Sequence, residues 1–183
     1  MQERTREGCR ATRSVASVPP VADDRSRTYA WDDPFALRDE MAGRSGLELM
    51  QMMAAGELPP PPIAKTLGFR LVEAGPGHAL FECEPAEYHY NPIGVVHAGL
   101  AMTLMDSAMG LAFVTTLEQP VGWTTLEVKA SFTRALTVET GLIRCTGSVI
   151  HPGRRVATTE ARIEDAEGRL CAHGTSTILV LDG

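Results

Sequence analysis

The sequence predicts an α+β domain in which a curved antiparallel β-sheet wraps one long central helix. Two strand-like runs come first, a long apolar segment follows, and four strand-like runs end the chain. Short turns separate most neighbouring strands and leave no room for the crossover helices that parallel strands need. A helix that is apolar on nearly every side must be enclosed, and the sheet is the only large surface available to enclose it.

Length and composition indicate one folded domain with some additional chain. The 183 residues are 44% hydrophobic and 22% charged, which excludes a wholly disordered or fibrous protein. A formal net charge of -6 gives no broad positive field and argues against nucleic acid as a partner. The Arg-rich start has no apolar run of signal-peptide length, so a cytoplasmic location is expected. The four cysteines form no C-x-x-C pair, so reduced structural thiols are expected and no metal or redox site: Cys9, Cys83, Cys145 and Cys171.

Three parts of the chain are distinguished by composition. Residues 1–40 lack hydrophobic periodicity and are expected to form a flexible tail. Residues 41–60 are expected to hold a short helix and a proline linker, because Ser45 and Glu48 match a capping box and Gly56 can end the helix. The proline run 59–62 favours an extended entry into the main domain, residues 61–183.

The strands follow from turn signals and from alternation. The turn 74–77 separates strands expected at 68–73 and 78–84. In 125–133, apolar residues alternate with polar ones, which predicts one buried face made of Leu126, Val128, Ala130 and Phe132. Further strands are expected at 141–151, 155–165 and 169–181.

The apolar segment 98–117 approaches the length of a membrane span. It carries Asp106 near its middle, with Thr103 and Ser107 beside it, so a core helix is expected and no membrane contact. A lone buried carboxylate costs several kcal/mol, on the order of the whole stability of a domain, and therefore needs a reason. Gly99, Thr103, Asp106 and Gly110 share one helical face made of small residues, which could border a groove.

The polar loop before this helix is the other candidate site. Backbone N–H groups at a helix start lack intrahelical partners and can bind an anion or a developing oxyanion. Structural alternatives stay open for each feature. Asp106 could pair with Lys129 or an Arg at the sheet edge, and His97 could be a hydrogen-bonded structural histidine. Gly94 and Gly99 could serve only turns and packing. The turn Gly153-Arg154-Arg155 is a solvated pair of charges or a phosphate clamp.

These residues resemble the hotdog-fold acyl-CoA thioesterases, specifically the PaaI-like branch. The resemblance rests on N-x-x-G-x-x-H-x-G followed by an apolar helix with an acid nine residues after the His, and it covers about residues 45–181. The matching residues are Asn91, Gly94, His97, Gly99 and Asp106. One position departs from the family, which usually has His-Gly-Gly where this chain has His97-Ala98-Gly99. The added methyl group could change acyl size or rate.

The resemblance implies a homodimer or a dimer of dimers with active sites between subunits, and no metal or other cofactor. It implies that Asp106 is the general base or the nucleophile and that Thr125 places the water, although a one-residue slip would exchange Thr125 with Thr124. Asn91 and His97 would come from the opposite subunit, and the Ala98 N–H would polarise the thioester carbonyl. Substrate contacts are expected from Gly94, Gly99, Thr124, Gly153, Arg154 and Arg155.

The leading hypothesis is therefore hydrolysis of acyl-CoA or aryl-CoA thioesters to the free acid and CoA. A non-catalytic acyl-CoA-binding sensor on the same fold is the alternative, and Asp106 with Asn91 and His97 favours the enzyme over it. A hydratase on this scaffold would need its Asp and His at the loop and the helix start, whereas the acid here lies deep in the helix.

Overall fold

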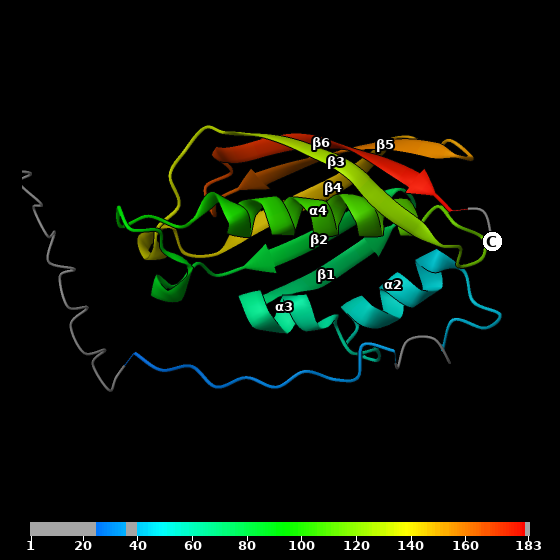
Figure 1. Ribbon diagram of the computed structural model, residues 1–183, viewed down its shortest axis with the longest axis horizontal. Coiled ribbons are helices and arrows are strands. Elements are labelled where there is room, and N and C mark those ends of the chain that lie inside the picture. The colour runs from blue at the N-terminus through cyan, green and yellow to red at the C-terminus, as the bar shows by residue number, and fades with distance from the viewer. Residues whose placement is uncertain (1–24, 36–39, 182–183) are drawn as a thin grey trace, which may run out of the picture.

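The computed structural model describes residues 25–35 and 40–181, and the sheet and helix have the predicted arrangement. Six strands form one antiparallel sheet in the order β1-β2-β4-β5-β6-β3, which wraps α4 (Figure 1). The strands are β1 (Phe69–Gly75), β2 (His78–Cys83), β3 (Trp123–Phe132), β4 (Ile143–His151), β5 (Val156–Glu164) and β6 (Leu170–Val180). The helices are α2 (Gly46–Ala54), α3 (Pro62–Leu67) and α4 (Ala98–Val114), with 3-10 turns η1 (Glu87–His89) and η2 (Val138–Thr140). The fold class and the order of the major elements are thus confirmed.

Helix α2 begins and ends as the sequence predicts. The Ser45 hydroxyl accepts the Glu48 N–H, and the Glu48 carboxylate accepts the Ser45 N–H at 2.7 Å, which completes the capping box. Helix α3 was not expected, because the proline run argued for extended chain. Pro62 occupies the first helical turn, where its missing N–H costs nothing, and Gly68 ends the helix at φ 73°.

Strand β3 differs from its predicted alternation. A bulge between Thr125 and Glu127 inserts one residue, so the strand changes face at Leu126. Leu126 is 56% exposed and leaves the predicted face. Phe132 keeps the side of Val128 and Ala130 but is 49% exposed, so the expectation that both side chains are buried is wrong. Thr125 is consequently turned toward α4, on the same side as Val128 and Ala130.

The sheet can wrap α4 closely because small residues lie beneath the middle of the helix. Paired positions on five successive strands form one row across the sheet, and all of them are glycine or alanine: Ala79, Gly147, Ala161, Gly174 and Ala130. A Cβ added to Gly147 would lie 2.2 Å from the Ala108 carbonyl oxygen in α4. The backbones of β4 and α4 therefore approach as closely as glycine permits.

Replacing this glycine tests the close approach. We expect Gly147→Ala to lower the free energy of unfolding by about 3 kcal/mol, because the nearest atoms are rigid backbone. Gly75→Ala is the matched control, since its added Cβ meets nothing closer than 4.0 Å. Urea unfolding of both variants measures the difference, and equal midpoints would contradict the packing described for α4.

Helix α4 is enclosed by the sheet on one side only. Leu104, Met105, Ala108 and Met109 are fully buried, whereas Thr103 and Asp106 are half-buried. None of the helices in the described part of the chain is long and apolar enough to cross a membrane.

Candidate functional site

The loop before α4 is built around the side chain of Asn91. Its Oδ1 accepts the N–H of Ile93 at 3.0 Å and that of Val95 at 3.4 Å, which closes a tight turn. Gly94 has φ 84° in this turn, a conformation that glycine adopts without strain. Gly94 therefore forms this turn and Asn91 shapes the loop, while a further role of either residue at the site stays a prediction.

His97 begins α4 as its N-cap. Its Nδ1 accepts the Gly99 N–H at 2.8 Å, so the neutral ring carries its proton on Nε2, and the ring is exposed. Its backbone N–H donates to the His89 carbonyl oxygen at 2.8 Å. The next residue, Ala98, has no hydrogen-bond partner for its N–H among the described residues. This N–H is a free donor at the positive end of a helix.

Asp106 contacts β3 through a single hydrogen bond. The Thr125 hydroxyl donates to Asp106 Oδ1 at 2.8 Å, whereas Thr124 is exposed on the other face. Asp106 forms no ion pair with any described residue, so the alternative of a partner at Lys129 or an Arg is not realised. Because Thr125 engages only Oδ1, the other carboxylate oxygen can accept a proton from a water molecule.

The two parts of the site are separated within one chain. Ala98 and Asp106 are eight positions apart in the helix, which amounts to about 12 Å along the axis. A reacting carbonyl carbon must lie about 3 Å from its attacking group and close to its oxyanion donor. Asp106 and the Ala98 N–H of one chain are therefore far apart for two groups that act on one carbonyl.

The Gly153-Arg154-Arg155 turn lies toward the other end of α4. The Arg155 carbonyl oxygen accepts the Val180 N–H at 2.9 Å, at the end of β6. In neighbouring β4, the Val149 N–H donates to the Gly77 carbonyl oxygen. The Gly77 N–H in turn donates to the Thr115 hydroxyl, directly after α4. Both arginines are exposed. Within one chain the turn does not meet the loop of Asn91 and His97.

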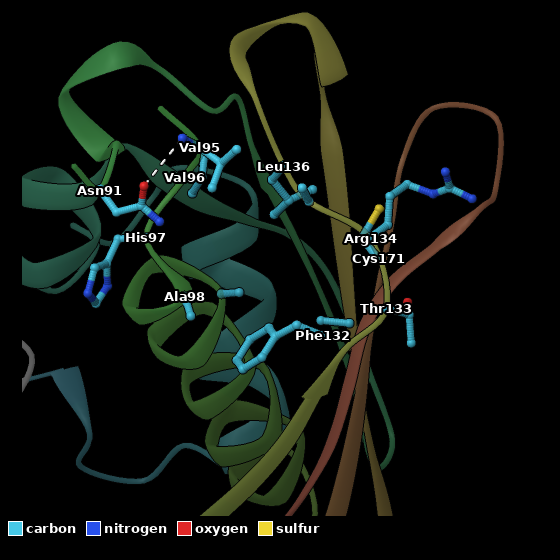
Figure 2. Close-up of a pocket in the computed structure, with 13 residues that line it drawn as sticks. Asn91, Val95, Val96, His97, Ala98, Phe132, Thr133, Arg134, Leu136 and Cys171 are labelled. Atoms are coloured by element: carbon cyan, nitrogen blue, oxygen red, sulfur yellow. Dashed lines mark hydrogen bonds between the residues drawn. The ribbon is translucent and has the colours of Figure 1, made fainter. Parts of the chain in front are cut away.

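A pocket of about 310 Å³ opens beside the start of α4. Asn91, His97 and Ala98 line one side, and the end of β3 with the loop after it lines the other, through Phe132, Arg134 and Leu136 (Figure 2). The Phe132 ring extends from β3 toward Ala98, whereas the Arg134 side chain points away from α4 (Figure 2). Sequence reasoning missed this second wall, because its residues carry no motif and lie more than thirty positions from His97. In the described ranges no three His, Cys, Asp or Glu side chains gather as metal ligands.

Comparison with known proteins identifies related sequences for most of the domain. A family model described as "Thioesterase superfamily" matches residues 93–172. The 1,4-dihydroxy-2-naphthoyl-CoA hydrolase of Listeria monocytogenes is 25% identical over 118 residues, which are 64% of this chain and 94% of that protein. Human acyl-coenzyme A thioesterase 13 is 29% identical over 108 residues, 58% of this chain and 76% of that protein.

A solved structure is similar in sequence as well as in fold. A conserved protein of Pseudomonas aeruginosa is 33% identical to this chain and superposes with a TM-score of 0.61. The match covers 65% of this chain and 93% of that one. The shared part therefore includes nearly the whole of the Pseudomonas protein, and the remainder of this chain lies outside it.

Proposed function

The chain belongs to the thioesterase superfamily and is a thioester-hydrolysing enzyme of that class, and we propose that it converts acyl-CoA or aryl-CoA thioesters to the free acid and CoA. The observation that carries this proposal is the pair of groups in α4: a carboxylate held by a threonine, and a free N–H at the helix start. One can activate water, and the other can stabilise an oxyanion.

We propose that Asp106 acts as the general base. It accepts a proton from a water molecule that attacks the carbonyl carbon, the C–S bond breaks, and the sulfur of CoA leaves with a proton. The Thr125 hydroxyl fixes the carboxylate by its bond to Oδ1. A general base never bonds to the acyl group, so in a single turnover in H₂¹⁸O no solvent ¹⁸O should enter the Asp106 carboxylate; its appearance there, detected by mass spectrometry of the peptide, would indicate a nucleophile instead.

The separation of about 12 Å between the two groups of one chain supports a site that is shared with a second copy of the chain. We infer that Asp106 and Thr125 of one subunit act with Asn91, His97 and the Ala98 N–H of its partner. Strand β3 supports this arrangement, since it is the last strand of the sheet, no other described strand pairs with its outer edge, and Leu126 and Phe132 are exposed. Pairing of two β3 edges would satisfy the strand and cover these side chains.

The direct test is CoA release from a panel of aliphatic and aromatic acyl-CoA thioesters. Turnover supports the enzyme and ranks the substrates, whereas binding of acyl-CoA without turnover would favour the sensor. The roles of Gly94, Gly99, Thr124, Gly153, Arg154 and Arg155 in substrate binding stay predictions. The proposed chemistry uses side chains, a backbone N–H and water.

Gly99 offers a test of the His97 cap. A Cβ at position 99 would lie 2.8 Å from His97 Nδ1, so we expect Gly99→Ala to displace the ring. Loss of the cap costs about 1 kcal/mol, which the better helix propensity of alanine offsets. Stability measured by urea should therefore change little while kcat falls.

His97→Asn is the companion variant for this experiment, because asparagine keeps a cap and removes the ring. If Gly99→Ala retains wild-type kcat, the position of the His97 ring is unimportant for turnover.

A further inference from the structure

Arg27, in the extended segment 25–35, contacts the end of α3 and the 3-10 turn η1, which precedes the loop of Asn91 and His97. The Arg27 guanidinium donates to the backbone carbonyl oxygens of Lys65 at 2.9 Å and Thr66 at 2.5 Å, at the end of α3. The same group lies over the Tyr88 ring, with its Cζ 4.3 Å from the ring centroid. A planar cation at the negative end of a helix and on an aromatic face makes two favourable contacts at once. Figure 1 shows this segment running beneath α3 and α2.

His89 holds the end of α3 and the turn η1 together from the interior of the protein. Its ring is only 6% exposed, and each nitrogen has a partner: Nδ1 accepts the Ala86 N–H at 3.0 Å and Nε2 donates to the Leu67 carbonyl at 2.9 Å. Burial, with the nearby Arg27 charge, lowers the pKa of His89 although the bond to Leu67 opposes it. The ring is therefore neutral at pH 7, as these two hydrogen bonds require.

Continuous contacts lead from this cluster to the start of α4. The Tyr88 ring packs edge-on against the His89 ring with centroids 4.3 Å apart. The His89 carbonyl oxygen then accepts the His97 N–H at 2.8 Å, directly before Ala98. Arg27 and His89 thus hold the end of α3, the 3-10 turn η1 and the helix start in one arrangement.

We propose that Arg27 and His89 are positioning residues that fix the Ala98 N–H for the transition state, an inference that rests on the proposed function. Neither residue touches the substrate. A displacement of about 1 Å at a reacting group can cost about 100-fold in rate. Loss of the anchor should therefore lower kcat more than it alters KM, because the oxyanion exists only in the transition state.

The first experiment compares Arg27→Ala, Arg27→Lys and Arg25→Ala in the full-length chain. Arg25 is the matched control, since it lies in the same segment and its ion pair with Glu87 is exposed and weak. We expect about a tenfold fall in kcat for Arg27→Ala, partial rescue by lysine, and no change for Arg25→Ala. Hydrogen exchange in residues 86–100 should quicken in Arg27→Ala and stay unchanged in β4–β6.

The second experiment separates the two bonds of His89 and keeps the test valid should one variant fold poorly. Asparagine can keep the acceptor near Nδ1, and glutamine can keep the donor near Nε2. We expect each of His89→Asn and His89→Gln to quicken exchange in residues 86–100 and to lower kcat.

The outcomes distinguish this inference from the proposed function. Wild-type kcat and unchanged exchange in Arg27→Ala would overturn the positioning role while the thioesterase stands. Faster exchange spread evenly over the whole chain would also overturn it, because that result indicates general destabilisation. If the wild type releases no CoA, the proposed function fails, and with it the positioning of a transition state.

Discussion

Asp106→Asn is expected to lower kcat for CoA release by about 10²–10⁴-fold, because the variant removes the proposed general base. The asparagine Oδ1 can still accept the Thr125 hydroxyl, so the shape of the site and the contact with β3 are preserved. The measurement is thiol release at saturating acyl-CoA, together with calorimetric binding of the same substrate. Binding should persist while turnover is lost.

Thr125→Val is the companion to this variant. It keeps the carboxylate but removes the hydrogen bond that fixes Oδ1, so a smaller fall of about tenfold is expected. An Asp106→Asn enzyme with wild-type kcat would exclude the carboxylate from the chemistry and leave its bond to Thr125 as a structural feature.

Ala98→Pro is expected to lower kcat by about 10²–10³-fold, the usual effect of removing one oxyanion donor. Proline has no N–H, yet it suits the first residue of a helix. The preceding His97 already has φ -62° and ψ 133°, the extended conformation that a residue before proline prefers. The substitution therefore replaces the N–H by the Cδ of the proline ring, while α4 retains its start.

Ala98→Gly controls for the side chain, because it keeps the N–H and restores the usual family residue. Thermal unfolding and steady-state kinetics should be measured on both variants. If Ala98→Pro folds normally and turns over at the wild-type rate, another group must stabilise the oxyanion.

Mixing the two defective chains tests whether the site is shared between subunits. In a dimer formed from Asp106→Asn and Ala98→Pro chains, one site combines the intact Asp106 of one chain with the intact Ala98 of the other. Random exchange makes half of the dimers mixed, so activity should recover to about a quarter of wild type. A mixture that stays as inactive as its parents would contradict a shared site.

The sequence alone was sufficient to predict those elements whose backbone is fixed by residues close together in the chain. Ser45 and Glu48 set the start of α2, and the spacing of Asn91, Gly94 and His97 marked a turn followed by a helix start. The sequence was insufficient at β3, where alternation predicted a buried Leu126. The position of a bulge depends on how two paired strands match. Strand β6, the partner of β3, begins more than forty residues after Leu126.

The sequence by itself therefore determined the strands, helices α2 and α4, their order and the acid within an apolar helix, because these depend on residues within a few positions of one another; the short helix α3 is the exception. Only the tertiary structure aligned glycine and alanine from five strands beneath α4 and turned Thr125 toward Asp106. It also brought Arg27 against Tyr88 and the end of α3. Each of these contacts joins residues distant in sequence. Burial of the shared core, which acts without regard to sequence separation, selects the contacts around α4, whereas the exposed Arg27 depends on hydrogen bonds and on its position over the Tyr88 ring.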